Sequence, residues 1–237
     1  VRDFVENRFS SAKHWGLFSQ EGTLIGDLAK GGQVTILDVS CYSTTPGAAG
    51  LRALVIGLIS QKLFVQRMVS RKMEEYEEIK KSVHYVMEEE KEGKQKYPLV
   101  WLVIDEAHNF LGKRVGADEN AIKLNAFELI AKEGRKYGLN ICIATQRPRD
   151  ITEGVLSQMG TLFVHRLTND KDRDVVERAC VREIDKTAAS FLPNLKQGEV
   201  AIVGVSFPIP MTVKISRPKI PPISDGPKFN KLWTGNG

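Results

Sequence analysis

A continuous apolar run at residues 99–104 ends abruptly in two adjacent acidic residues, Asp105 and Glu106. Six apolar residues without alternation predict a strand that is buried on both faces, as in the centre of a parallel α/β sheet. Ligands in such sheets collect at the carboxyl ends of the strands. We therefore expect the two acids to lie at a functional site.

A second apolar run, at 139–145, leads into Gln146. Between the two runs, the segment 120–137 has apolar residues at helical spacing and is followed by Gly138, which predicts a helix with a glycine C-cap. A strand, a helix and a parallel strand form one right-handed crossover. This connection predicts that Gln146 lies beside the two acids at the same edge of the sheet.

The remaining pattern predicts a long helix and several short strands. A strand is expected at 33–39, followed by a loop rich in Thr, Pro and Gly. Helical spacing continues from 48 to about 96 and changes from apolar to heavily charged after Arg67. Such a helix leaves the core and projects, either to contact a subunit or partner or as a solvated helix with i,i+4 ion pairs.

Towards the C-terminus the pattern predicts a short strand at 160–165 and a helix at 170–182. Two strands, at 199–205 and 211–215, are expected to form an antiparallel pair. After Ser216 the chain becomes rich in proline, which is typical of a segment without regular structure.

The residues after the first strand suit nucleotide hydrolysis. In a nucleoside triphosphatase, Asp105 would hold Mg²⁺ through water and Glu106 would polarise the attacking water. An amide at Gln146 can sense a γ-phosphate or orient water. The alternative is a buried strand that ends at a helix N-cap. We interpret His108 as a packing or hydrogen-bonding residue, because no second histidine lies at metal-ligand spacing.

Several motifs in a fixed order resemble the HerA branch of the HerA/FtsK ATPases. Each motif is weak alone, but their ordered combination is specific. The resemblance extends from about Gly32 to about Pro218 and is carried by Asp105–Phe110, Glu133–Leu139, Ala144–Pro148, Val155–Gln158 and Arg166–Asn169.

This resemblance implies a RecA-like α/β core with a mostly parallel sheet, occupying 1–216, and a C-terminal arm at 217–237. It also implies an ATP- and Mg²⁺-dependent DNA translocase or helicase that forms hexamers and partners a NurA-type nuclease in DNA-end resection. Asp105 and Glu106 then correspond to the Walker B acids, and Gln146 couples the γ-phosphate to motion.

The resemblance further suggests that Arg135 is an arginine finger that acts on a neighbouring subunit's nucleotide. The alternative is a cation that is favoured at a helix C-terminus. Arg147 and Arg166 are nucleotide-binding candidates that compete for the same role. Lys113 and Arg114, in a glycine-containing loop after the acids, are candidates for DNA contact, or an ordinary solvent loop.

One departure from the family pattern is important. The sequence contains no Gly-x-x-x-x-Gly-Lys-Ser/Thr motif, so the Walker A loop that binds phosphates is missing. Because the chain also begins at Val1 instead of Met, we expect the C-terminal part of a longer protein, which is inactive alone. Two other interpretations stay open: a conjugation- or pilus-type secretion ATPase, and a non-catalytic assembly or partner-binding module.

Composition adds little to this picture. The net charge is +5, from 34 basic and 29 acidic residues, which barely favours a nucleic-acid partner. The three cysteines, an odd number, are typical of reduced intracellular thiols. Polar residues interrupt the apolar segment 51–65, which predicts a cytoplasmic protein without a membrane span.

Overall fold

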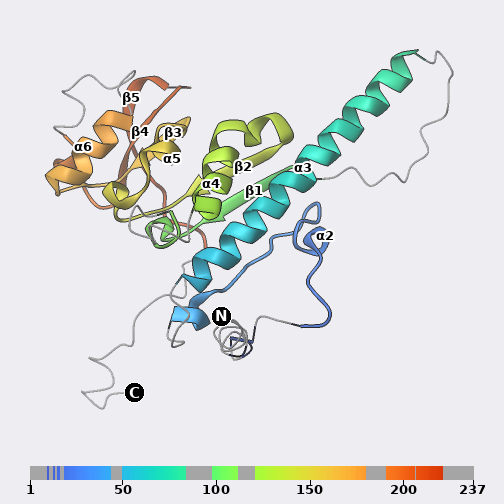
Figure 1. Ribbon diagram of the computed structural model, residues 1–237. Coiled ribbons are helices and arrows are strands. Elements are labelled where there is room, and N and C mark those ends of the chain that lie inside the picture. Colours follow the sequence, from blue (N-terminus) through green and yellow to red (C-terminus); the bar gives the residue numbers. More distant parts are fainter. Residues whose placement is uncertain are drawn as a thin grey trace. The chain divides into compact units, whose positions relative to one another are not determined.

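The computed structural model in Figure 1 describes most of the chain as two compact units. Unit 1 comprises Val1–Met159 and Asp174–Ala179, and unit 2 comprises Gly160–Arg173 and Cys180–Gly237. The described residues are 10, 13, 15–16, 19–43, 50–83, 98–111, 121–179, 191–205 and 207–220.

Unit 1 contains one parallel strand pair together with longer and shorter helices. Its longer helices are α3 (Leu51–Val83) and α4 (Ala121–Glu133), and its strands are β1 (Val100–Ile104) and β2 (Leu139–Ile143). Its short helices are α2 (Ile25–Leu28), α5 (Glu153–Leu156), η1 (Ser40–Ser43), η2 (Ala107–Asn109), η3 (Gly134–Tyr137) and η4 (Pro148–Asp150).

The predicted strand–helix–strand connection is confirmed. β1 and β2 pair in parallel, with Val100 opposite Leu139 and Ile104 opposite Ile143. Helix α4 connects them and continues into η3, which ends at Gly138 in the left-handed conformation, with φ 73°. Parallel strands need such a crossover, because a tight turn reverses the chain direction. The α/β class, with parallel strands and a long helix, is therefore confirmed.

The prediction that β1 is buried on both faces is wrong. Ile104 is buried, but Trp101 and Val103 are 68% and 66% exposed. Side chains alternate between the two faces of a strand, and the described part of the chain covers only the face that carries Leu102 and Ile104. An uninterrupted apolar run therefore marks two apolar faces, although only one of them is covered here.

The predicted long helix is α3, which is buried on one face in its first half and mostly exposed towards its end. Leu51, Leu63 and Phe64 are buried in the core of unit 1, whereas Tyr76 and Ile79 are exposed. The prediction that the helix leaves the core is confirmed up to Val83, and residues 84–96 lie outside the described residues. Figure 1 shows this helix, in cyan to green, extending beyond β1 and β2.

Helix α3 also bears on the membrane prediction. Contrary to the expectation of a segment that is too short and too polar, Leu51–Lys80 is long and apolar enough to cross a membrane by length and composition. This is weak evidence for a span, because buried core helices of soluble proteins have the same properties. Leu63 and Phe64 pack with Ile130 and Leu139 in one such core.

The strand predicted at 33–39 is absent from the structure, which assigns this segment no regular element. Val34 and Ile36 are 89% and 86% exposed. The segment makes local hydrogen bonds instead: the Thr35 hydroxyl donates to the Leu28 carbonyl. At its end, the Asp38 carboxylate accepts the Ser40 N–H, which lowers the pKa of Asp38 from its ordinary value.

Unit 2 contains a three-stranded antiparallel sheet in the order β3–β4–β5. Its strands are β3 (Thr161–Val164), β4 (Glu199–Gly204) and β5 (Phe207–Lys214), and η5 (Leu192–Asn194) precedes β4. Helix α6 (Asp170–Ala179) begins in unit 2, and its last six residues belong to unit 1. The predicted antiparallel pair is thus confirmed, although β5 begins at Phe207, earlier than expected.

Gly134 is the point where α4 continues into η3, and a side chain has no room there. A Cβ at this position would lie 2.3 Å from the Leu139 carbonyl oxygen and 3.1 Å from Ile130 Cγ2. We expect Gly134→Ala to lower the free energy of unfolding by about 1–3 kcal/mol, because buried backbone must move. Urea unfolding measures this. Gly26→Ala, with no atom within 4 Å of the new Cβ, is the control and should change stability little. Equal effects would contradict this packing argument.

Candidate functional site

The two adjacent acids lie in a short turn that interrupts the pairing of β1 with the end of β2. The Ala144 N–H donates to the Ile104 carbonyl at 2.9 Å, and the Ala144 carbonyl accepts from the Ala107 N–H, also at 2.9 Å. Both backbone groups of Ala144 are therefore used, by the residues on either side of the acids. Asp105 and Glu106 are left to project from the sheet edge between these two bonds.

Backbone conformation distinguishes Glu106 from the other described residues. It is the only non-glycine residue among them with positive φ, at 46°. Such a conformation costs a non-glycine residue of order 1–3 kcal/mol and clusters at functional sites. The Glu106 N–H donates to Asp105 Oδ1 at 2.8 Å. The turn thus orients two carboxylates within one local structure.

This turn has two features that the sequence pattern did not specify. The acids do not continue the extended strand, since β1 ends at Ile104 and Glu106 is left-handed. Nor does Asp105 cap the following helix: the N-cap residue of η2 is Glu106, and no side chain makes a capping hydrogen bond there. Of the alternative interpretation, the strand end is present, but the side-chain helix cap is not.

The predicted approach of Gln146 to the acids is confirmed. Gln146 Nε2 donates to Glu106 Oε1 at 2.9 Å, across the carboxyl ends of the two parallel strands. Both residues are accessible, with 41% of the Glu106 side chain exposed. A carboxylate and an amide from residues forty apart are thus in direct contact at a surface that a ligand can reach.

His108 and Thr145 complete the cluster. His108 Nδ1 lies 3.3 Å from Glu106 Oε2 and 3.2 Å from Thr145 Oγ1. Thr145 Oγ1 also accepts the Arg147 N–H at 3.0 Å. The interpretation of His108 as a hydrogen-bonding residue is confirmed. Thr145 was not predicted, although its position directly after the second apolar run was the available signal.

The chemistry of these side chains limits how a metal could bind. No group of three or more His, Cys, Asp or Glu that could hold a metal ion occurs in the described part of the chain. Asp105 is an exposed oxygen donor at the sheet edge. One carboxylate is sufficient for Mg²⁺ when water and substrate phosphates supply the other ligands. The residues therefore fit a nucleotide-borne Mg²⁺ and do not fit a structural metal site.

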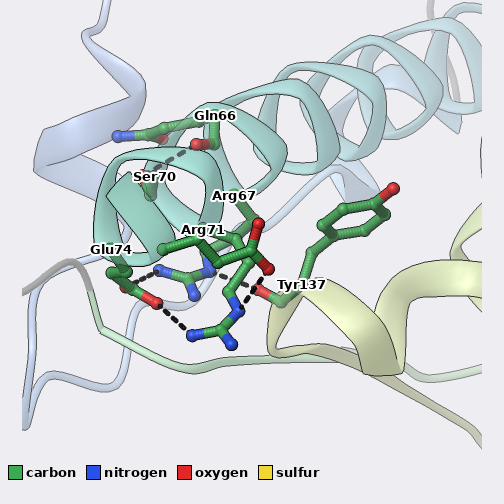
Figure 2. A network of polar contacts seen from close by, with 7 residues as sticks. Gln66, Arg67, Ser70, Arg71, Glu74 and Tyr137 are labelled. Atoms are coloured by element: carbon green, nitrogen blue, oxygen red, sulfur yellow. Dashed lines mark hydrogen bonds and ion pairs between the residues drawn. The ribbon is translucent and has the colours of Figure 1, made fainter. Parts of the chain in front are cut away.

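Arg135 lies at the other end of β2 from the acids. It belongs to η3, which precedes β2, whereas Gln146 follows β2. Figure 2 shows how this segment is held: Arg67 of α3 donates from Nε to the Tyr137 carbonyl at 2.7 Å and pairs with Glu74. The structure therefore does not bring Arg135 to the acids of its own chain.

The other basic candidates have different positions. Arg147 directly follows Gln146 and is exposed. Arg166, also exposed, follows β3 in unit 2. Lys113 and Arg114, the candidates for DNA contact, lie outside the described residues. Of the predicted site residues, Glu106 and Gln146 are thus in contact in unit 1, and Asp105 and Arg147 are their neighbours along the chain.

The fold is α/β, and the candidate site lies at the carboxyl ends of its parallel strands, where such folds commonly bind ligands. No protein-family model matches the chain. It is 32% identical over 157 residues to the DNA double-strand break repair helicase HerA of Pyrococcus furiosus, and 33% identical over 120 residues to HerA of Saccharolobus solfataricus. The predicted resemblance to HerA-type proteins is therefore confirmed as a partial match.

These matches are partial on both sides. They cover 66% and 51% of this chain, but only 26% and 23% of the two HerA proteins. The chain thus spans about a quarter of the length of these curated relatives. Among solved structures, it is similar to the genome packaging NTPase B204 of Sulfolobus turreted icosahedral virus 2 in complex with ATP-gammaS. That match has a TM-score of 0.47 and 16% identity, and it covers 85% of this chain and 76% of the other.

Proposed function

We propose that this chain is the Walker B and sensor half of a RecA-like, HerA-type ATPase that moves DNA. One observation carries the proposal: Gln146 Nε2 donates to Glu106 Oε1 at 2.9 Å, at the ends of two parallel strands. The similarity to two proteins that are described as DNA double-strand break repair helicases also supports this proposal.

The proposed reaction is ATP hydrolysis. Glu106 would accept a proton from the water whose oxygen bonds to the γ-phosphorus, while the bond from that phosphorus to the ADP oxygen breaks. Gln146 would leave the Glu106 carboxylate and bind the γ-phosphate. Because Gln146 would exchange the Glu106 carboxylate for the γ-phosphate, the presence of that phosphate would be coupled to the position of the segment that follows β2.

Asp105 is the proposed ligand of Mg²⁺, through water. When bound, this ion would neutralise charge on the phosphates. Arg147 would lie near the nucleotide, and Arg166 is a further candidate. Because Arg135 lies at the far end of β2 from the acids, a role at the nucleotide of a neighbouring subunit suits it better than a role in its own site.

The wider function follows from the family resemblance. We propose duplex DNA as the polymer that is moved, a hexamer as the assembly, and a NurA-type nuclease as the partner in DNA-end resection. Lys113 and Arg114 are the proposed DNA contacts. The proposed location is the cytoplasm, since one face of the first half of α3 packs within unit 1.

ATP hydrolysis by two proteins tests this proposal: this chain, and a protein extended upstream to include a phosphate-binding loop. We expect turnover only from the extended protein, because the sequence of this chain lacks the Walker A motif. Duplex DNA should increase that turnover.

If the extended protein does not hydrolyse ATP, with or without DNA, the proposed motor function is contradicted and the non-catalytic assembly module is favoured. A membrane-targeting segment in the upstream sequence would favour the conjugation- or pilus-type ATPase instead.

A further inference from the structure

We infer that His108, with Thr145, is a positioning residue that holds one oxygen of the Glu106 carboxylate and leaves the other as the base. This inference rests on the proposed function and deepens it. It concerns two residues to which neither the sequence motifs nor the resemblance gives a catalytic role.

The two oxygens of Glu106 have different partners. Oε1 accepts a hydrogen bond from Gln146 at 2.9 Å, and Oε2 lies 3.3 Å from His108 Nδ1. Gln146 follows β2, and its side chain is exposed. His108 belongs to η2, where it directly follows the buried residue Ala107. One oxygen is therefore held by an exposed amide, and the other by a residue of the partly buried turn.

The chemistry of the partners decides where the imidazole hydrogen lies. An ionised carboxylate only accepts hydrogen bonds, so the contact with Oε2 is attractive only if Nδ1 carries the hydrogen. Thr145 Oγ1, 3.2 Å from the same nitrogen, can share that hydrogen in a three-centre bond. Because Thr145 Oγ1 also accepts the Arg147 N–H, the hydroxyl is fixed by the backbone beside it.

This arrangement gives the two oxygens different tasks. When Gln146 turns towards a γ-phosphate, Oε1 loses its donor and becomes free to accept the proton of the attacking water. Oε2 stays bound to His108, so the carboxylate keeps its orientation during the exchange. Positioning of this kind matters because a misplaced base transfers protons slowly, even when nucleotide binding is intact.

The first test is the tautomer of His108 in the 237-residue chain, measured by ¹⁵N NMR, which distinguishes the two neutral tautomers from each other and from the imidazolium. His108→Asn identifies the signal. We expect hydrogen on Nδ1 in the parent protein. In Glu106→Ala, we expect a shift towards hydrogen on Nε2, because Thr145 can then donate to the bare Nδ1. Hydrogen on Nε2 in the parent, or the same tautomer in both proteins, would overturn the inference.

The second test uses ATP hydrolysis by the protein extended to include a phosphate-binding loop. His108→Leu removes the donor, whereas His108→Asn places an amide nitrogen near the position of Nδ1. We expect about a tenfold or larger fall in kcat for His108→Leu, with KM for ATP within about twofold of the parent, and recovery of most of the loss in His108→Asn. Thr145→Val should give a smaller fall, again in kcat, and serves if His108→Leu fails to fold.

Equal kcat for the parent and His108→Leu, equal losses in the Leu and Asn variants, or a change in KM alone would each refute positioning by His108. Glu106→Gln separates this failure from that of the proposed function. If Glu106→Gln hydrolyses ATP normally, Glu106 is not the base and both ideas fail. If Glu106→Gln is inactive while His108→Leu is normal, only the role of His108 is refuted.

Discussion

Replacing Glu106 by Gln is expected to lower ATP hydrolysis by about 10²–10⁴-fold in a protein that includes a phosphate-binding loop. The amide is nearly the same size as the carboxylate, but it has no basic oxygen to accept a proton from water. Its NH₂ group would also face the NH₂ group of Gln146, or force the amide to turn, at the 2.9 Å contact. Nucleotide affinity should be nearly unchanged, because Glu106 is not a proposed phosphate or metal ligand.

The measurements are steady-state ATP hydrolysis and nucleotide affinity by equilibrium binding. Glu153→Gln is the matched control: this glutamate is also exposed in unit 1, at the start of α5, and has no proposed part in the reaction. It should turn over at the parental rate. Normal turnover by Glu106→Gln would contradict its role as the base, and loss of nucleotide binding would assign Glu106 to ligand binding instead.

The largest stability effect is expected at Arg67. Its side chain is only 4% exposed, donates to the Tyr137 carbonyl and lies 3.6 Å from Glu74 (Figure 2). Arg67→Ala removes a buried cation, leaves that carbonyl without this donor and opens a cavity between α3 and η3. Loss of one partner from such a buried arrangement typically costs about 3–5 kcal/mol. We expect the free energy of unfolding to fall by about 3 kcal/mol.

Arg71 provides the comparison, one turn further along the same helix. Its side chain is 36% exposed and pairs with Glu74 and Glu75. Exposed pairs of this type contribute about 0–1 kcal/mol, so Arg71→Ala should have a small effect. Urea unfolding followed by helical circular dichroism measures both variants. If Arg67→Ala and Arg71→Ala lower the free energy of unfolding equally, the buried contacts of Arg67 do not stabilise the protein as proposed.

Sequence patterns predicted those elements of the fold that are specified by local signals. The crossover from β1 through α4 to β2 follows from two apolar runs, a helical period and Gly138. The prediction of a strand at 33–39 was wrong because a strand forms only by pairing with a neighbouring strand. This segment makes local hydrogen bonds instead, such as the one from the Thr35 hydroxyl to the Leu28 carbonyl. The prediction that β1 is buried on both faces was wrong for a related reason. An apolar run specifies which faces of a strand can be buried, but not which other segments cover them.

The same limit applies to the site. The contact between Gln146 and Glu106 was predictable, because the crossover rule brings the carboxyl ends of parallel strands together. The left-handed turn at Glu106 was not, since its geometry depends on the two hydrogen bonds that hold Ala144. The different contacts of the two Glu106 carboxylate oxygens could not be predicted from the sequence either, because they depend on the positions of individual side-chain atoms.

The open face of β1 gives the protein an optical probe of its own. Trp101, 68% exposed, lies on that face together with Val103. Indole fluorescence responds to the polarity around the ring, so any segment or partner that covers this face would move Trp101 out of water and shift its emission to the blue. Once the other two tryptophans, Trp15 and Trp233, are replaced by Phe, association at the sheet can thus be followed without a label, within four residues of the catalytic candidate Asp105.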